Sequence, residues 1–216
     1  MMSNDLTFIH RFEPGSRLEA APLLLLHGTG GDENDLLSLG QAVSPGSALL
    51  SPRGQVLEQG MPRFFRRLSE GVFDEDDVQR RANELADFVE AARARYGIAA
   101  PVALGYSNGA NIAAAMLLLR PDVLAGAILL RAMVPLSQPP QADLRDKPVL
   151  IVSGKLDPII PASNSAQLAA LLANAGANVQ HPVLPTGHQL TQTDLTLGRE
   201  WIKAVGFLQA EKTETA

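Results

Sequence analysis

A serine in a sharp turn is the residue of this sequence best suited to covalent chemistry. Gly105-Tyr-Ser-Asn-Gly109 has the G-x-S-x-G pattern that places a nucleophilic serine between a strand and a helix. An apolar run at residues 102–104 precedes it and a helix-like run at residues 110–120 follows, as that setting requires. The same residues also fit a plain Gly-Ser turn, because so short a pattern arises by chance. With these flanks, the pattern predicts that Ser107 is a nucleophile and that its flanking glycines avoid backbone collisions.

A serine hydroxyl is a weak nucleophile, so it needs a base, and the base needs a carboxylate that orients it. In hydrolases with such a turn, the chain order is serine, acid, histidine. Asp157 comes just after the apolar residues 148–153, so its carboxylate would lie at the carboxyl edge of a parallel sheet. Asp157 also directly precedes Pro158, a pair that is common in loop turns and at helix entries. We expect Asp157 to be the orienting acid.

The base is expected among the 4 histidines. Only His188 follows both Ser107 and Asp157 in a loop after a strand, and the preceding glycine leaves that loop free to aim the ring. His181 lies within the strand-like residues 179–184 and is the fallback. An exposed loop histidine without a chemical role is the plainer interpretation of His188. The chain order favours His188 as the base.

A second glycine-rich loop, His27-Gly-Thr-Gly-Gly31, follows an apolar strand and leads to a helix expected to start near Asp32. Its backbone N–H groups can point toward the same sheet edge as the serine, where two donors would stabilise the oxyanion that forms when the serine attacks a carbonyl group. We assign this role to the N–H groups of Thr29 and Asn108. A phosphate-binding loop is the competing interpretation, but both glycine-rich phosphate patterns are absent. The histidine that opens the loop is expected to be structural.

These residues can meet only if the strands that precede them have their carboxyl ends at the same edge of one sheet. Short apolar runs alternate with longer helix-like segments, which is typical of a mainly parallel sheet with helices on both faces, the α/β class. Buried strands are predicted at residues 22–26, 48–51, 101–105, 125–130, 148–153 and 179–184, with an antiparallel edge at 6–12. Helices are predicted at residues 75–96, where apolar residues recur at helical spacing, at 161–176 and at about 194–205. Asp74 is expected to cap the first of these helices, and Gly97 to end it.

The composition limits the classes of function. Of the 216 residues, 46% are hydrophobic and 19% charged, so the chain can bury a core and the composition argues against intrinsic disorder. A formal net charge of −5 without a long basic stripe argues against a nucleic-acid partner. The absence of cysteine excludes a thiolate nucleophile and cysteine-ligated metals. Without a secretory signal or an apolar run of about 20 residues, we expect a cytoplasmic protein with no membrane span.

Several motifs follow one another along the chain: Leu23-Leu-Leu-Leu-His-Gly-Thr-Gly-Gly-Asp-Glu-Asn-Asp-Leu36, Ser51-Pro-Arg-Gly54, Phe64-Phe-Arg-Arg67, Glu70-Gly-Val-Phe-Asp74, Gly105-Tyr-Ser-Asn-Gly109 and Gly187-His188. Together they resemble the phospholipase/carboxylesterase family of α/β-hydrolases over nearly the whole chain. They look closest to the small bacterial carboxylesterases that include hydroquinone-resistance hydrolases, and are more distantly similar to acyl-protein thioesterases. The resemblance implies a serine esterase with no metal and no cofactor. It also implies a triad of Ser107, Asp157 and His188 and an oxyanion hole at Thr29 and Asn108.

The long stretch of residues 52–73 is expected to be irregular and functional, because it exceeds an ordinary connection. We expect Phe64 or Phe65 to line an acyl or aromatic pocket there, with Arg66 nearby to receive a polar or anionic group. Arg131, after a strand, is a further candidate for the same pocket. Alternatively, the phenylalanines anchor the stretch to the core and the arginines pair with nearby carboxylates.

The sequence therefore predicts a serine carboxylesterase for small or single-chain esters. One α/β-hydrolase domain is expected over residues 1–210, followed by a polar tail at 211–216, which leaves no room for a large cap domain. The alternatives are a thioesterase or lysophospholipase, where the thioesterase branch has Gln and Leu in place of Asn108 and Thr29, and a ligand-binding sensor with the same fold. The expected partner is a small-molecule ester, and a homodimer is plausible from exposed apolar loop residues.

Overall fold

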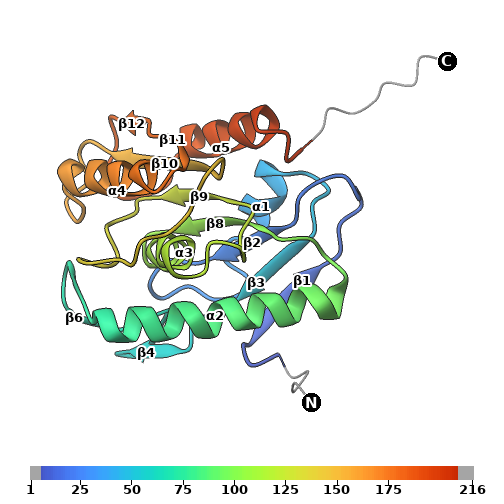
Figure 1. The fold of residues 1–216 in the computed structure, drawn as a ribbon, viewed down its shortest axis with the longest axis horizontal. Helices are drawn as coiled ribbons and strands as arrows, with labels where there is room; N and C mark the ends of the chain where they lie inside the picture. The colour runs from blue at the N-terminus through green and yellow to red at the C-terminus, as the bar shows by residue number, and fades with distance from the viewer. Residues whose placement is uncertain (1–5, 209–216) are drawn as a thin grey trace.

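The computed structural model describes residues 6–208, and its central feature is one 8-stranded sheet (Figure 1). Its strands are β1 (His10–Glu13), β2 (Leu23–Leu26), β3 (Leu49–Pro52), β8 (Val102–Tyr106), β9 (Gly126–Leu130), β10 (Pro148–Gly154), β11 (Asn178–Gln180) and β12 (Val183–Leu184). They lie in the order β1-β3-β2-β8-β9-β10-β11, with β12 also beside β10. Only β1 runs antiparallel, against β3. The predicted α/β class is therefore confirmed, and the antiparallel edge strand is present but spans residues 10–13 instead of 6–12.

Helices cover both faces of this sheet. They are α1 (Leu37–Val43), α2 (Glu75–Tyr96), α3 (Asn108–Leu119), α4 (Ala162–Asn174) and α5 (Gln192–Ala204). The four leucines of β2 are fully buried and alternate between two cores. Leu24 and Leu26 pack with side chains of α2, α3 and α4, whereas Leu23 and Leu25 pack with those of α1 and α5. Because successive strand side chains point to opposite faces, this run of leucines holds three layers together.

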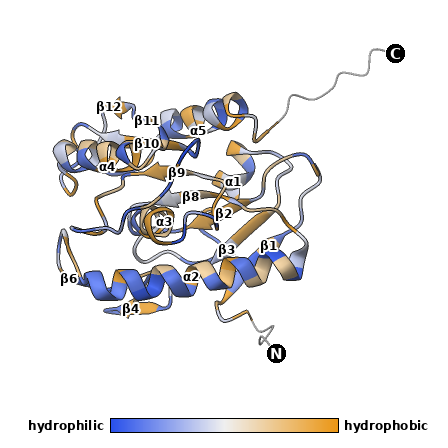
Figure 2. Cartoon of the chain, viewed as in Figure 1, coloured by the Kyte–Doolittle hydropathy of each residue, from blue (hydrophilic) through white to orange (hydrophobic). Residues whose placement is uncertain are grey.

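Most predicted elements agree with the structure to within a residue or two. The helix α2 has the predicted bounds, its cap Asp74 accepts a hydrogen bond from the Asp77 N–H, and Gly97 ends it in the left-handed region with φ of 65°. Its outer face is largely hydrophilic, while β3 and β9 are hydrophobic (Figure 2). The helix expected near Asp32 begins only at Leu37, because the Asp32 carboxylate accepts the Asn34 N–H at 2.7 Å and holds a turn instead.

The single strand expected at residues 179–184 is divided into β11 and β12. The stretch expected to be irregular, residues 52–73, instead forms two small antiparallel hairpins. They consist of β4 (Val56–Glu58) with β5 (Met61–Arg63), and of β6 (Arg67–Ser69) with β7 (Val72–Phe73). Positive φ angles at Gln59, Gly60 and Gly71 form the tight turns between them. Strands of two or three residues are too short for an alternating pattern to stand out in the sequence.

The predicted polar tail at residues 211–216 lies outside the described residues. Within residues 6–208, no helix combines the length and the apolar character needed to cross a membrane.

Candidate active site

Ser107 lies in a strained turn directly after β8 and occupies the N-cap position of α3. Its backbone has φ of 51° and ψ of −114°, a conformation that costs a non-glycine residue about 1–3 kcal/mol. A Cβ atom on Gly109 would lie 2.0 Å from the Leu26 carbonyl oxygen, and one on Gly105 would lie 2.6 Å from the Gly109 carbonyl oxygen. Both glycines are therefore required by the close approach of backbone to backbone, as the sequence predicts.

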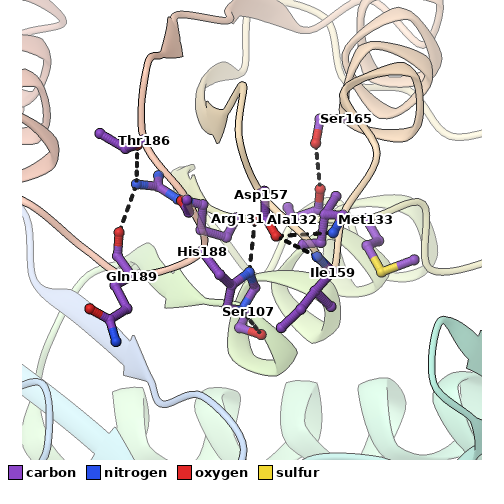
Figure 3. Close-up of polar contacts among 12 residues, drawn as sticks. Ser107, Arg131, Ala132, Met133, Asp157, Ile159, Ser165, Thr186, His188 and Gln189 are labelled. Atoms are coloured by element: carbon purple, nitrogen blue, oxygen red, sulfur yellow. Dashed lines mark hydrogen bonds and ion pairs between the residues drawn. The ribbon is translucent and has the colours of Figure 1, made fainter.

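The structure brings Ser107, His188 and Asp157 together, although they are far apart in the sequence (Figure 3). The Nε2 atom of His188 lies 3.0 Å from the Ser107 Oγ atom, and its Nδ1 atom lies 2.8 Å from the Asp157 Oδ2 atom. Because a carboxylate only accepts hydrogen bonds, Nδ1 carries the ring proton. Nε2 is then free to accept a proton from the serine hydroxyl.

The acid is held at both of its oxygen atoms. The Asp157 side chain is 1% exposed, and its Oδ1 atom accepts hydrogen bonds from the N–H groups of Ile159 and Ile160 at 2.9 and 3.0 Å. Oδ2 is thereby aimed at His188. A carboxylate that faces the imidazole in this way fixes the ring tautomer and stabilises its charged form.

The backbone N–H groups of Thr29 and Asn108 are placed to receive a developing negative charge. Both residues line the cavity above Ser107, and among the described residues neither N–H group has an acceptor. The N–H of Asn108 belongs to the first turn of α3, where the helix dipole also favours an anion. Two further contacts fix these residues: the Phe64 N–H donates to Asn108 Oδ1 and Arg63 Nη1 donates to Thr29 Oγ1, each at 2.7 Å.

His27 is structural, as expected from its position in the loop. Its ring is buried; Nδ1 donates to the Gly28 carbonyl oxygen at 2.7 Å, and Nε2 accepts the Gly54 N–H at 2.9 Å. Burial holds the pKa of His27 below its usual value of 6.5, because the charged ring loses its hydration. A protonated ring could no longer accept the Gly54 N–H. The neutral form of His27 therefore links the loop of residues 27–31 to the segment that leads into β4.

This lowered pKa predicts a stability change with pH. Between the lower folded pKa and 6.5, the unfolded chain binds a proton that the folded protein does not. The free energy of unfolding should therefore fall by up to about 1.4 kcal/mol per pH unit as the pH is lowered through this window. Thermal melts across the window should show a shallower decline for His27→Gln, since an amide can make both hydrogen bonds without titrating.

His181→Gln is the comparison variant, because burial also lowers the pKa of His181 and its replacement should remove a separate share of the same decline. The Nε2 atom of His181 lies 2.8 Å from the Ser153 Oγ atom, away from the loop of residues 27–31. Equal pH slopes for the wild type and His27→Gln would contradict the assignment to His27.

The cavity beside Ser107 has a volume of about 240 Å³. It is lined by Thr29, Arg63, Arg67, Glu70, Gly71, Phe73, Tyr106, Ser107, Asn108, Asn111, Met133, Ile159, Ile160 and His188. Asn111 accepts the Met133 N–H through Oδ1, and Arg63 is 4% exposed. The lining thus combines apolar side chains with several hydrogen-bond donors next to the serine.

None of the four residues expected to line the pocket is among those that line this cavity. Phe64 and Phe65 are buried in the core that underlies the stretch, and the Arg66 side chain is exposed and pairs with Asp74. Arg131 has its side chain fully buried beneath the His188 loop. The alternative interpretation, in which the phenylalanines anchor the stretch, describes the first two residues correctly.

Arg63, Arg67 and Phe73 take the predicted places in the cavity lining. No local signal separates Arg67 from Arg66, because the register of two short hairpins decides which arginine faces the cavity. The sequence analysis does not single out Asp194, which pairs with the buried Arg131, although Thr191-Gln-Thr-Asp194 fits the capping-box pattern. In the described part of the chain, no three His, Asp or Glu side chains form a group that could hold a metal ion.

The sequence and the fold are similar to those of several known proteins. The model of the family described as Phospholipase/Carboxylesterase matches residues 9–205. A Bacillus subtilis (strain 168) protein named "Putative hydrolase MhqD" is 48% identical over 196 residues, which cover 90% of this chain and 97% of that protein.

Two solved structures are also similar. The Bacillus cereus carboxylesterase is 45% identical with a TM-score of 0.90, over 92% of this chain and 95% of its own. The protein YahD, whose structure was solved with malic acid, is 30% identical with a TM-score of 0.87, over 92% of this chain and 100% of its own.

Proposed function

The chain belongs to the phospholipase/carboxylesterase family, and from that premise we propose that it is a serine carboxylesterase that forms an acyl-enzyme at Ser107. The observation that carries the proposal is the position of the His188 ring, whose two nitrogen atoms lie 3.0 Å from the serine oxygen and 2.8 Å from the Asp157 carboxylate. Hydrolysis of short acyl aryl esters, compared between the wild type and Ser107→Ala, tests it.

In the first half-reaction, the Ser107 Oγ atom attacks the ester carbonyl carbon while His188 Nε2 takes the hydroxyl proton. The carbonyl oxygen becomes an oxyanion, which accepts hydrogen bonds from the Thr29 and Asn108 N–H groups. Donors of this kind typically contribute about 2.7–4 kcal/mol each to the stabilisation of the transition state. His188 then gives its proton to the alcohol oxygen as the carbon–oxygen bond of the ester breaks.

The second half-reaction repeats these steps with water. His188 removes a proton from a water molecule that attacks the acyl-enzyme, the same two N–H groups hold the second oxyanion, and the proton passes to Ser107 as the acid leaves. Asp157 keeps the ring in the tautomer that can act as a base and stabilises the imidazolium formed at each attack. The cycle needs only the side chains that already converge on the serine.

The size and the charge of the cavity favour small substrates with a polar or acidic group. Its volume of about 240 Å³ is smaller than the roughly 300–1,000 Å³ typical of ligand pockets, which argues against bulky acyl chains. Arg63 and Arg67 share one carboxylate, that of Glu58, at 3.3 and 2.8 Å, so Glu58 balances only one of the two charges. Glu70 also lines the cavity, but it is exposed in a hairpin turn, where water screens its charge.

Burial lowers the pKa of Arg63, because its charge is poorly hydrated there, and an anion in the cavity would replace the missing hydration. YahD, a 30% identical protein, was solved with malic acid, a small dicarboxylate, which is in line with this polarity. We therefore propose that the preferred esters carry a carboxylate or a comparable acceptor on their acyl or alcohol part.

This substrate class gives a prediction for Arg67→Gln. We expect the KM for an acidic ester, such as a mono-aryl succinate or an acetylated lactate, to rise about tenfold, because a hydrogen bond to a charged group contributes about 1.5–3 kcal/mol and Arg67 is partly exposed. The KM for the neutral aryl acetate should change by less than about twofold. Steady-state kinetics on both esters measure the difference.

Arg66→Gln is the matched control, because Arg66 is the neighbouring arginine, lies outside the cavity and pairs with Asp74. It should leave both KM values unchanged. An equal rise of KM for the acidic and the neutral ester in Arg67→Gln would remove the charge preference while leaving the esterase proposal intact.

Thioester and lysophospholipid hydrolysis are the nearest alternatives within the same chemistry. The small cavity disfavours a long lysolipid chain, and it does not separate an ester from a thioester of the same acyl group. Values of kcat/KM for an ester, a thioester and a lysolipid, measured side by side, would rank the three.

A further inference from the structure

Arg131 is the largest fully buried side chain of the described residues, and its backbone is strained. It follows β9 directly and has a φ of 57°, in the left-handed region that non-glycine residues rarely adopt. A charge buried in this way must be fully paired to be tolerated. Such strain persists only where the surrounding structure enforces the conformation, and it is common at functional sites. The strain therefore marks Arg131 as a candidate functional residue.

The guanidinium of Arg131 has an acceptor for each of its five N–H groups. Nη1 donates to Asp194 Oδ1 at 2.6 Å and to the Val152 carbonyl oxygen at 3.2 Å. Nη2 donates to Asp194 Oδ2 at 3.0 Å and to the Gln189 carbonyl oxygen at 3.1 Å, with Thr186 Oγ1 at 3.3 Å. Nε donates to the Gly187 carbonyl oxygen at 3.0 Å. Figure 3 shows the guanidinium between Thr186 and Gln189.

Asp194 fixes the guanidinium from the other side. Its side chain is 1% exposed and pairs with both Nη atoms of Arg131. The same carboxylate caps α5, since its Oδ2 atom accepts hydrogen bonds from the Thr191 N–H at 2.7 Å and from the Thr191 hydroxyl at 2.9 Å. The orientation of Arg131 is thereby coupled to the start of a packed helix.

The loop of residues 186–189 is the third part of this arrangement. It belongs to no helix or strand, and the backbone carbonyls of its four successive residues are each held by a different donor group. These donors are the Leu156 N–H for Thr186 (2.9 Å), Arg131 Nε for Gly187 (3.0 Å), the Tyr106 hydroxyl for His188 (3.2 Å) and Arg131 Nη2 for Gln189 (3.1 Å). Arg131 thus donates hydrogen bonds to the loop on both sides of His188.

The other two donors connect the loop to the rest of the triad. Tyr106 directly precedes Ser107, and Leu156 directly precedes Asp157. Gly154 also allows the loop to come close, since a Cβ atom there would lie 2.5 Å from the Gly187 carbonyl oxygen and 2.6 Å from that of Thr186. The three chain segments that carry the triad therefore meet at the carbonyls of this loop.

We propose that Arg131, held by Asp194, is a positioning residue that fixes the loop of residues 186–189 and so keeps the His188 ring between Asp157 and Ser107. The proposal rests on the proposed hydrolytic function of this triad. Arg131 itself touches no reacting atom. Its effect should appear in kcat, because a histidine displaced by about 1 Å can lower the rate about 100-fold.

The key variant is the double substitution Arg131→Met with Asp194→Asn. Arg131→Met alone would leave the Asp194 charge buried without its partner and could prevent folding. In the double variant that charge is gone, and the amide oxygen of Asn can still accept the Thr191 hydrogen bonds and cap α5. Arg131→Lys is the second variant, since it keeps the ion pair with Asp194 but cannot reach the Gly187 and Gln189 carbonyls at the same time.

Three measurements are made on each variant: thermal unfolding, kcat and KM for a short acyl aryl ester, and the far-downfield proton NMR resonance of the His188 Nδ1–H. We expect both variants to fold, kcat to fall about 100-fold with KM changed by less than about threefold, and the resonance to broaden or disappear. Arg120→Met, which removes a surface ion pair with Asp87 and Glu90, is the matched control and should behave as the wild type.

Folded variants with wild-type kcat and an intact resonance would overturn the proposal. A loss of stability accompanied by wild-type kcat and an intact resonance in the remaining folded protein would also overturn it, since it would show a purely structural role. Ser107→Ala in the same assay separates this failure from failure of the proposed function: an active Ser107→Ala removes the triad chemistry, whereas an inactive Ser107→Ala beside fully active Arg131 variants removes only the positioning role.

Discussion

Ser107→Ala is expected to lower kcat for a short acyl aryl ester by at least about 10⁴-fold, because it removes the atom that forms the acyl-enzyme. The fold should survive this change. Among the described residues, the serine hydroxyl has one hydrogen-bond partner, the His188 ring at 3.0 Å, and the strain at φ of 51° is the same for any residue with a Cβ atom. Thermal unfolding within a few degrees of the wild type, measured beside the kinetics, establishes that the loss is chemical.

Covalent labelling separates this esterase from a ligand-binding protein with the same fold. A fluorophosphonate probe should modify wild-type Ser107, as mapped by mass spectrometry, and should leave the alanine variant unmodified. A wild type that neither reacts with the probe nor hydrolyses the ester would favour the binding protein. A Ser107→Ala variant with the full rate would remove the serine from the mechanism.

Asp157→Asn should have the second-largest effect, a fall in kcat of about 10⁴-fold with a nearly unchanged KM. The N–H groups of Ile159 and Ile160 would continue to hold the side-chain oxygen that now lies 2.9 and 3.0 Å from them. The amide NH₂ would then point at His188 Nδ1 and donate to it. The ring would have to carry its own proton on Nε2, where it could not accept the serine proton.

This tautomer argument can be separated from a general loss of charge. Asp143→Asn is the matched control, because Asp143 is an exposed carboxylate that pairs with Arg145. It should leave kcat unchanged. An Asp157→Asn enzyme with more than about a tenth of the wild-type kcat would show that the carboxylate does not set the tautomer of His188.

The candidate site was predictable where a residue sits in a local pattern at the end of a strand. Ser107 has two glycines that the backbone contacts require, Asp157 follows β10, and His188 follows β12. Parallel strands end at one edge, so chain order alone predicts that these three residues share that edge. The structure places His188 within hydrogen-bond distance of both Ser107 and Asp157. The bounds of the helix α2 were equally predictable, because its cap, apolar stripe and terminal glycine are all local signals.

The cavity lining was not predictable for a related reason. Which arginine faces the cavity depends on hairpins of two or three residues per strand, and a shift of one residue reverses every side chain. The proposed role of Arg131 depends on contacts with residues 55 to 63 positions away in the sequence, which no local pattern encodes. Long-range packing therefore overrode the expectation that a charged residue after a strand would face the crevice.

The stretch of residues 52–73 contacts the two segments that carry the proposed oxyanion donors, and it also forms part of the cavity wall. The Gly54 N–H is bound by His27, the Pro62 carbonyl oxygen accepts the Gly30 N–H, and the Phe64 N–H is bound by Asn108. Exchanging this segment for that of a relative, to transfer a substrate preference, would therefore also displace the proposed oxyanion donors and lower kcat. To change the substrate selectivity without lowering kcat, the backbone of this segment should be kept and only the side chains that face the cavity replaced.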